Sequence, residues 1–353
     1  MNSLLELTAG HNCVSIVGMS KNSGKTTVLN RLILECGQAG LRVALCSVGR
    51  DGERTDVITG KLKPAIAVSK GTIFATTRNL LAYFDIGKEL LLSTGVGTAL
   101  GEVVVYRALD DGLIELSGPS MNSQLPPLLE FFISQGAGMI LIDGAVSRKA
   151  SSSPVVAGCT VLCTGADYDP DMSIVITDTA HIAEILKSRA LPDSRAAGLI
   201  VSHKGPGKLH IDKDPLFLHT DKDPGILLID KDYNATVFPK SGGISKQDIM
   251  AARCLYFPGA LTDAVCETVF KAAFPTHGIS IVTDNASKLM VSRQVYSRFL
   301  SRGAGFYVLD PILPACICIN PHSTMGKDFD KDSFLADMQK AVDIPVINVA
   351  QAT

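Results

Sequence analysis

A short segment near the start of the chain has the residue types of a phosphate-binding loop: Met19-Ser-Lys-Asn-Ser-Gly24-Lys25-Thr26. It lies between the apolar run Val14–Gly18 and a helix-like stretch that begins at Thr27. In such loops, backbone N–H groups and the helix N-terminus surround the β-phosphate, because both carry partial positive charge. Lys25 is expected to reach the β- and γ-phosphates, and the Thr26 hydroxyl is expected to bind Mg²⁺. The predicted nucleotide-binding residues are Gly18, Lys21, Asn22, Ser23, Gly24, Lys25, Thr26 and Thr27.

The spacing of the two glycines departs from the common form of the motif. That form has four residues between the first glycine and the Gly-Lys-Ser/Thr sequence, whereas here Met19 occupies the leading position and Gly18 lies one residue earlier. Some P-loop families use this longer spacer. A chance Gly-Lys-Thr at a strand-to-helix turn is the alternative, and the strand before and helix after the loop argue against it.

A phosphate-binding loop needs acidic partners for Mg²⁺ and for water, and the chain offers two. The predicted strand 138–143 ends in Leu-Ile-Asp143-Gly144, an apolar run into a carboxylate as in a Walker B motif. The alternative for Asp143 is an Asp-Gly turn that ends a buried strand. Asp51 follows the next predicted strand after the P-loop helix, where it could bind Mg²⁺ or orient the attacking water. The predicted catalytic residues are therefore Lys25, Asp143 and Asp51, and the predicted metal ligands are Thr26, Asp51 and Asp143.

Basic side chains near these motifs have two interpretations. Lys21 lies inside the loop, and Arg148 and Lys149 follow the Walker B candidate. They could neutralise charge that develops during phosphoryl transfer, or they could be solvated surface residues.

The sequence indicates which nucleotide base is bound only through the absence of a guanine-binding motif. Guanine-selective proteins usually carry Asn-Lys-x-Asp after a strand. The nearest match, Ser245-Lys-Gln-Asp248, follows a Gly-Gly turn instead. ATP is therefore favoured over GTP.

The elements that must position these residues follow an alternating pattern over the first two hundred residues. Apolar β-branched runs predict strands at 13–18, 42–48, 101–106, 138–143, 158–163 and 197–202. Helical periodicity predicts helices at 25–37, 74–86, 124–136 and 175–189. Continuous apolar strands are typical of parallel sheets that are covered on both faces. The predicted fold is thus α/β, with a doubly wound, mostly parallel sheet.

The sequence pattern changes near residue 205, where Asp-Lys-Asp recurs at Asp212, Asp221 and Asp230. We interpret this region as short strands joined by Asp-rich turns. A calcium site is the alternative, but no full calcium-loop pattern is present. A smaller α/β domain is predicted beyond residue 252, with helices at 262–273, 287–302 and 332–342 and strands at 279–284, 306–309 and 315–319. The predicted boundaries are 1–204, 205–252 and 253–353.

Two turns in the second half follow predicted strand ends. They begin at Asp284 and Asn320. Open α/β sheets place ligand sites at such ends, although turn chemistry alone also explains both sequences.

Bulk composition narrows the class of protein. The chain has 353 residues, 46% of them apolar, and a formal net charge of −2, which indicates a packed protein rather than disorder. No basic excess favours nucleic acid or a membrane surface, and neither a signal peptide nor a long apolar span is expected. The nine cysteines show no Cys-x-x-Cys spacing. A reduced, cytoplasmic protein that uses Mg²⁺ is expected.

The loop spacing and the Asp143-Gly144 pair resemble the dethiobiotin synthetase and cobyric acid synthase branch of P-loop proteins. The sequence Lys21-Asn-Ser-Gly-Lys-Thr-Thr27 also looks like the loop of molybdopterin-guanine-dinucleotide biosynthesis protein B. These families belong to the class of the signal-recognition GTPases and the Mrp/MinD ATPases. The resemblance implies Mg²⁺ and ATP or GTP as ligands, and it implies a possible homodimer across the nucleotide.

A resemblance over more of the chain is to the P-loop subunit of lysine 5,6-aminomutase reactivase. It rests on Val17–Asn30, Gly49–Glu53, Lys63-Pro64, Ile142–Ala145 with Arg148-Lys149, and Thr164–Ala166. This resemblance implies nucleotide-driven removal of damaged cobalamin from an adenosylcobalamin-dependent aminomutase. It also implies a MutS-like ATPase as a second subunit.

Three functions are compatible with the sequence. The first is a nucleotide-hydrolysing, chaperone-like reactivating factor, whose turnover is slow without its protein partner. The second is an ATP-dependent ligase or kinase of the dethiobiotin synthetase type, in which Lys21, Lys63 or Lys149 would position a carboxylate substrate. The third is a nucleotide-sensing scaffold without turnover.

Overall fold

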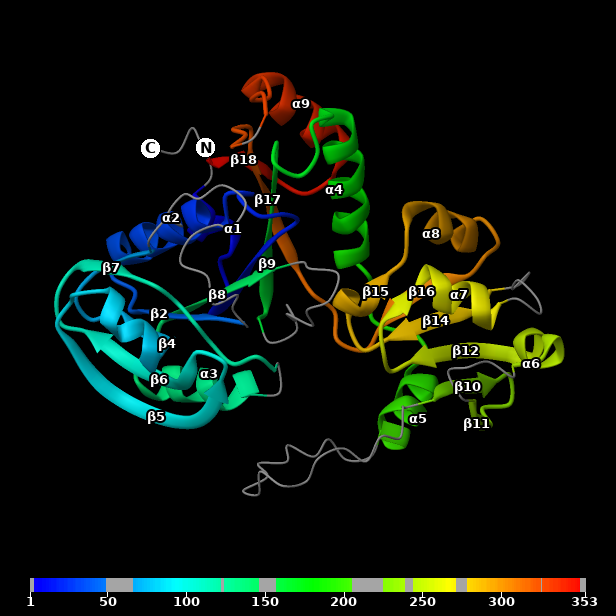
Figure 1. The fold of residues 1–353 in the computed structure, drawn as a ribbon. Coiled ribbons are helices and arrows are strands. Elements are labelled where there is room, and N and C mark those ends of the chain that lie inside the picture. Colours follow the sequence, from blue (N-terminus) through cyan, green and yellow to red (C-terminus); the bar gives the residue numbers. More distant parts are fainter. Residues whose placement is uncertain are drawn as a thin grey trace. The chain divides into compact units, whose positions relative to one another are not determined.

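The computed structural model describes residues 3–48, 66–121, 124–145, 157–204, 225–238, 244–270, 278–324 and 326–349. The chain divides into two compact units, which are drawn together in Figure 1. Unit 1 comprises Met1–Glu184 and Ile312–Thr353, and unit 2 comprises Ile185–Pro311.

Unit 1 is built on a nine-stranded sheet in the order β18-β17-β9-β1-β8-β2-β4-β6-β5. Neighbouring strands from β18 to β4 are parallel, and β4, β6 and β5 pair antiparallel at one edge. This confirms the expected α/β class with a large, mostly parallel sheet. The strand bounds are β1 Cys13–Gly18, β2 Val43–Ser47, β4 Ile73–Thr77, β5 Lys88–Thr98, β6 Gly101–Ala108, β8 Met139–Ala145, β9 Cys159–Gly165, β17 Pro314–Asn320 and β18 Val346–Asn348.

Smaller elements complete unit 1. A separate antiparallel pair joins β3 to β7. The remaining bounds are β3 Ile66–Val68, β7 Gly112–Ile114, α1 Leu4–Leu7, α2 Lys25–Gln38, the 3₁₀ helix η1 Arg78–Tyr83, α3 Leu125–Ser134, α4 Met172–Leu186 and α9 Lys331–Ala341.

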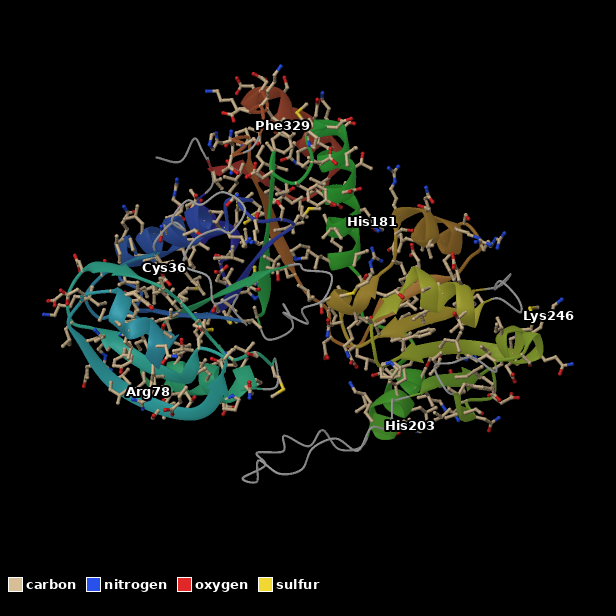
Figure 2. All side chains as sticks on the ribbon, in the orientation of Figure 1. Cys36, Arg78, His181, His203, Lys246 and Phe329 are labelled. Carbon is tan, nitrogen blue, oxygen red and sulfur yellow. The ribbon has the colours of Figure 1, made fainter. Side chains whose placement is uncertain are left out.

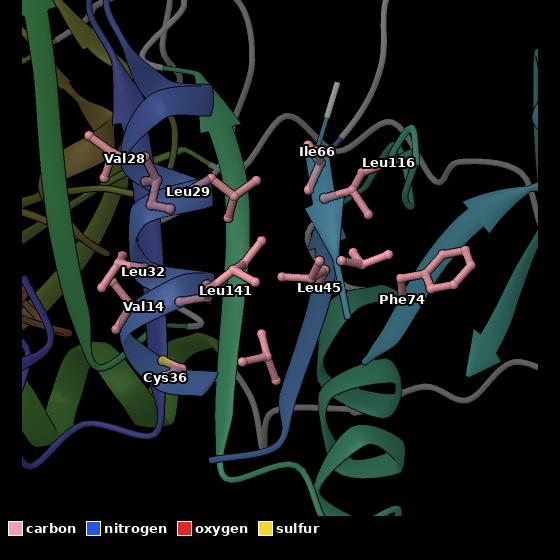
Figure 3. Close-up of a cluster of buried hydrophobic side chains, with 14 of the residues drawn as sticks. Val14, Val28, Leu29, Leu32, Cys36, Leu45, Ile66, Phe74, Leu116 and Leu141 are labelled. Atoms are coloured by element: carbon pink, nitrogen blue, oxygen red, sulfur yellow. The ribbon is translucent and has the colours of Figure 1, made fainter. Parts of the chain in front are cut away.

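The sheet of unit 1 is packed on both faces. Successive strand residues point to opposite faces, so Leu141 of β8 joins the core beneath α2, whereas Ile140 and Ile142 join the core beneath α3. Figure 3 shows the first of these cores, with Leu29 and Leu32 of α2 beside the sheet. Burial on two faces explains why these strands read as continuous apolar runs.

Helix α2 follows from the spacing of its apolar residues. Val28, Leu29, Leu32, Ile33 and Cys36 recur at helical intervals, and all are buried. The side chain of Cys36 is fully buried, whereas those of Arg78 and Lys246 are exposed on their own units (Figure 2). The predicted strand 13–18 and helix 25–37 therefore form where expected, and they bracket the loop.

Unit 2 contains a five-stranded sheet in the order β11-β10-β12-β14-β16. Strands β12, β14 and β16 are parallel, and the hairpin β10–β11 adds an antiparallel edge. A short parallel pair, β13 with β15, lies outside this sheet. The bounds are α5 Ser194–Lys204, β10 Ile226–Asp230, β11 Ala235–Phe238, α6 Lys246–Ala251, β12 Ala252–Phe257, β13 Leu261–Thr262, α7 Asp263–Val269, β14 Ser280–Thr283, η4 Ala286–Lys288, β15 Leu289–Met290, α8 Arg293–Leu300 and β16 Gly305–Val308.

Two predicted elements are wrong, and the predicted helix 287–302 is only partly right, because η4 and β15 occupy 286–290 and α8 begins at Arg293. The predicted helix 74–86 is instead strand β4 followed by the short 3₁₀ helix η1, because Ile73–Thr77 is buried between β2 and β6. The predicted strand 197–202 lies in helix α5, which buries Ala196 and Ile200 one helical turn apart and leaves Val201 exposed.

The structure also divides the chain differently from the predicted boundaries. Strands β17 and β18 pair into the sheet of unit 1, although the sequence places them in a separate domain at 253–353. Unit 2 begins at Ile185, within the predicted first domain. The reason is that β17 is an apolar strand whose parallel partner, β9, lies about 150 residues earlier, and local sequence patterns do not reveal such pairing.

The third Asp-Lys-Asp sequence forms the predicted turn. The Asp230 carboxylate accepts backbone N–H groups of Asp232 and Asn234 in the β10–β11 hairpin. The copies at Asp212 and Asp221 lie outside the described residues. Among the described residues, no helix is long and apolar enough to cross a membrane.

Candidate phosphate-binding site

The candidate site lies where β1 ends at the centre of the parallel part of the unit 1 sheet. Strand β1 pairs with β8 on one side and with β9 on the other, and all three point the same way. Their carboxyl ends therefore share one edge of the sheet. The loop 19–24 starts at this edge and leads directly into α2, as the sequence predicts.

The loop backbone presents the N-terminus of α2 without a side-chain cap. Gly24 occupies the N-cap position with φ +91° and, as a glycine, offers no side chain to cap the helix, and the first turn of α2 contains no acidic residue. Asn22 also has a left-handed backbone, with φ +57°. The first N–H groups of a helix need partners from outside it, so an anion fits this end.

Lys25 folds back across the start of the loop. Its Nζ donates to the Ser20 carbonyl oxygen at 3.1 Å. A Cβ placed on Gly18 would lie 2.5 Å from that Nζ and 2.3 Å from the Ser23 Oγ, so position 18 accepts only glycine without rearrangement. The ammonium group is thereby held over the loop, beside the helix N-terminus.

Two hydroxyl groups in the loop are buried without hydrogen-bond partners among the described residues. They are the Oγ atoms of Ser20 and Ser23, and Ser23 is fully buried. Buried polar atoms are normally satisfied, and a phosphate oxygen is one group that would satisfy these. The chemistry of the loop therefore fits a polyphosphate.

Asp143 lies in β8, opposite Ile16 of β1 and Ser47 of β2. The strands bring its carboxylate to the same sheet edge as the loop. If Mg²⁺ were bound, Asp143 and the Thr26 hydroxyl would offer it the hard oxygen donors that it prefers. Among the described residues no cluster of three or more His, Cys, Asp or Glu side chains could hold a metal.

A second wall of the site comes from the end of the chain. Asn320 closes β17, and its side-chain Nδ2 donates to the Asn22 carbonyl oxygen at 2.9 Å. Gly165, at the end of β9, permits this approach, because a Cβ there would lie 2.4 Å from the Asn320 carbonyl oxygen. The Ala166 N–H donates to that same carbonyl.

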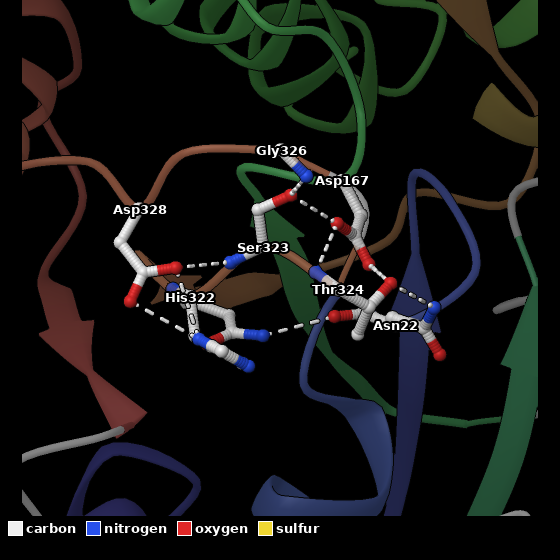
Figure 4. A network of polar contacts seen from close by, with 8 residues as sticks. Asn22, Asp167, His322, Ser323, Thr324, Gly326 and Asp328 are labelled. Carbon is white, nitrogen blue, oxygen red and sulfur yellow. Dashed lines mark hydrogen bonds and ion pairs between the residues drawn. The ribbon is translucent and has the colours of Figure 1, made fainter. Parts of the chain in front are cut away.

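A polar network continues from this wall into the segment Asn320–Thr324 (Figure 4). Asp167 accepts hydrogen bonds from Ser323 and Thr324, and the Thr324 Oγ1 accepts one from the Asn22 Nδ2 at 3.2 Å. Partial burial opposes ionisation of Asp167, but the hydrogen bonds from Thr324, Ser323 and Asn22 outweigh it and lower its pKa. Asp167 is therefore a carboxylate at neutral pH.

No family model, curated protein or solved structure matches this chain. Function is therefore inferred from the geometry of the loop and from the resemblances of its sequence.

The predicted site residues divide into three groups. Gly18, Asn22, Ser23, Gly24 and Lys25 form the loop described above, and Thr26 is half-buried in the first turn of α2. Lys21 and Thr27 are exposed. The remaining candidates lie outside the described residues: Asp51, Lys63, Arg148 and Lys149.

The nearest match to a guanine signature has a local structural role. Ser245 and Asp248 form a reciprocal capping box at the start of α6 in unit 2, so this sequence is a helix cap in the fold.

The sequence did not single out Asp167 or Thr324, and it marked Ser323 only as the last residue of the turn that begins at Asn320. Asp167 directly follows Thr164-Gly-Ala166, and Thr324 follows the turn at Asn320, so both lie just beyond buried strands. The available signal was the polar residues that follow the ends of β9 and β17. Those residues come together only because β17 lies beside β9, which the sequence does not reveal.

Proposed function

We propose that this chain binds and hydrolyses a nucleoside triphosphate, with Mg²⁺, at the loop between β1 and α2. The observation that supports this most directly is Lys25 folded over Gly18 beside an uncapped helix N-terminus. Such an arrangement concentrates positive charge where a β- or γ-phosphate would lie.

In this proposal each residue of the loop has a distinct task. The amides of the loop and of α2 bind the phosphates, and Lys25 neutralises charge on the γ-phosphate. The Ser23 hydroxyl satisfies a phosphate oxygen. Thr26 and Asp143 would hold Mg²⁺, which stabilises the charge that develops during transfer. ATP is the favoured nucleotide, because the one string that approaches a guanine signature caps α6.

Substitution of Lys25 by alanine tests the binding site. Lys25→Ala should abolish measurable binding of a fluorescent ATP analogue, since the ammonium group is the principal cation of the loop. Lys331→Ala is a matched control, because Lys331 is likewise the first residue of its helix, α9, and should leave the affinity unchanged. Equal affinity of Lys25→Ala and the native chain would refute the proposed site.

Substitution of Asp143 by asparagine tests hydrolysis separately. Asp143→Asn should keep ATP affinity within about threefold while lowering the hydrolysis rate by about a hundredfold, the scale of a lost transition-state interaction. The readout is phosphate release under saturating ATP. Unchanged hydrolysis would exclude Asp143 from the reaction.

We also propose that the hydrolysis serves a protein partner, an adenosylcobalamin-dependent aminomutase, together with a second ATPase subunit. The support is the resemblance to the P-loop subunit of lysine 5,6-aminomutase reactivase. Affinity capture with Asp143→Asn in the presence of ATP should recover a cobalamin enzyme from the source cells. Stimulation of hydrolysis by a small carboxylate instead would favour a ligase or kinase of the dethiobiotin synthetase type.

A further inference from the structure

We propose that Asp167 is a positioning residue: it fixes Thr324 against Asn22 and so holds the phosphate-binding loop in its binding conformation. This inference rests on the proposed function, since it assigns a role in the same site. The hydrogen bonds of Asp167 described in this structure go to Ser323 and Thr324 rather than to the Gly24-Lys25-Thr26 sequence that would bind the phosphates.

The Asp167 carboxylate is committed to the Asn320–Thr324 segment through both oxygens (Figure 4). Its Oδ1 accepts the Ser323 Oγ–H and the Thr324 backbone N–H, each at 2.8 Å. Its Oδ2 accepts the Thr324 Oγ1–H at 2.6 Å. Bonds to an ionised acceptor are stronger than neutral ones, so the two bonds from Thr324, with the third from the adjacent Ser323, define the position of Thr324.

The donor–acceptor direction of these hydrogen bonds links Asp167 to Asn22 of the loop. Because the Thr324 hydroxyl gives its hydrogen to Asp167, its lone pairs are directed elsewhere and accept the Asn22 Nδ2–H at 3.2 Å. The Asn320 Nδ2 donates to the Asn22 carbonyl at 2.9 Å. Thr324 thus holds Asn22 through its side chain, and Asn320 of the same segment holds it through its backbone carbonyl.

Asn22 is the residue of the loop that most needs this support. Its φ of +57° is left-handed, a conformation that non-glycine residues rarely adopt. The dihedral angles of Asn22 set the direction of the peptide groups at Ser23 and Gly24, which lead into the helix N-terminus. Without these hydrogen bonds the loop would be less well preorganised, and its affinity for phosphate would fall.

A second carboxylate, Asp328, also hydrogen-bonds to the Asn320–Thr324 segment and serves as an internal control. Asp328 accepts the Ser323 backbone N–H at 2.9 Å and contacts the His322 Nδ1 at 3.0 Å. None of its described contacts is to Asn22 or Thr324. Asp328 therefore shapes the turn without acting on the loop.

The test compares five variants by ATP affinity and by steady-state hydrolysis. Asp167→Asn and Thr324→Val should each weaken ATP binding about tenfold, the scale of one lost hydrogen bond to a charged group. The double variant should lose little more ATP affinity than either single variant, because both changes break the same chain of hydrogen bonds from Asp167 through Thr324 to Asn22. KM should rise while kcat stays nearly constant, since the loop geometry affects binding rather than the chemical step. Thr324→Ser should restore the affinity, and Asp328→Asn should leave it within about twofold.

Hydrogen exchange of the loop amides without nucleotide provides a second measurement. Asp167→Asn should speed exchange at residues 19–25, and Asp328→Asn should not. ATP affinity and loop exchange both unchanged in Asp167→Asn would overturn the inference, as would failure of Thr324→Ser to restore binding. The proposed function would survive these outcomes if Lys25→Ala still abolished binding. If the native chain bound no nucleotide, both would fall.

Discussion

At the scale of single residues, the site depends on how closely small groups approach one another. Gly18 has room for no side chain, Gly24 caps α2 in a left-handed conformation, and the Ser23 hydroxyl is buried without a partner. These features would be costly in a loop with only a structural role, because the unsatisfied buried hydroxyl lowers stability. They are consistent with a loop shaped for an anion.

Substitution of Gly18 by alanine tests this close approach. The new Cβ would lie 2.3 Å from the Ser23 Oγ and 2.5 Å from the Lys25 Nζ, so both side chains must move. We expect ATP affinity to fall about tenfold or more, a factor that needs a loss of only about 1.4 kcal/mol. The measurement is the Kd of Gly18→Ala determined by titration calorimetry.

Gly37→Ala is the matched control for that experiment. Gly37 lies in α2, and nothing approaches an added Cβ within 4 Å. The substitution should stabilise the protein by up to about 1 kcal/mol through helix propensity and should leave the affinity unchanged. If the two variants bound ATP equally well, Gly18 would not be part of a tight cradle.

At the scale of elements, the sequence was most informative where one strand and one helix are joined directly. The period of α2 and the apolar run of β1 predicted both elements and the loop between them. The predicted helix 74–86 failed because Phe74–Thr77 is stabilised by strand neighbours rather than by its own periodicity. The strand predicted at 197–202 was wrong because a short apolar stretch suits either a strand or the buried face of a helix.

The second wall of the site could not be predicted for a related reason. Asn320 and Thr324 act on Asn22 only because β17 lies next to β9. Pairing of strands so far apart in the chain leaves no local pattern. The sequence marked Asn320 only as a turn after a strand.

Unit 2 contains a charged junction between elements that predicts a dependence on pH. Asp284, just after β14, accepts hydrogen bonds from Lys204 of α5, Lys288 of η4 and Tyr256 of β12. Burial opposes ionisation of Asp284, but these donors outweigh it and lower its pKa below the ordinary value. The ionised form therefore stabilises the folded state at neutral pH. That contribution should be lost as the pH falls below about 4, through the lowered pKa.

Urea unfolding followed by circular dichroism, at several pH values, measures this effect. Asp284→Asn should be less stable than the native chain at pH 7, and the difference should shrink in acid. Comparison of the two proteins cancels the contributions of the other carboxylates. A stability difference that stays constant from neutral to acidic pH would contradict the proposed role of the Asp284 charge.

At the scale of the whole molecule, unit 1 is assembled from both ends of the chain. Residues 312–353 supply β17, α9 and β18, and the side chains of Ile317, Ile319, Phe334 and Met338 are fully buried. A boundary at residue 204, as the sequence suggested, would expose the edge of β9 and remove Asn320 from the loop.

A fragment that ends at residue 204 tests this view of the architecture. The fragment 1–204 should unfold at a much lower temperature than the full chain and should not bind ATP, because the sheet edge at β9 loses its partner and its cover. Thermal unfolding and ATP titration of the two proteins provide the comparison. Full affinity in the fragment would show that residues 312–353 are dispensable for the site.

The central claim is that the loop between β1 and α2 binds the phosphates of a nucleotide. Calorimetric titration of the unmodified full-length chain with ATP, in the presence of Mg²⁺, tests it most directly. The predicted result is saturable binding that Lys25→Ala abolishes and Lys331→Ala leaves intact. The absence of heat with both ATP and GTP at millimolar concentrations would contradict the claim.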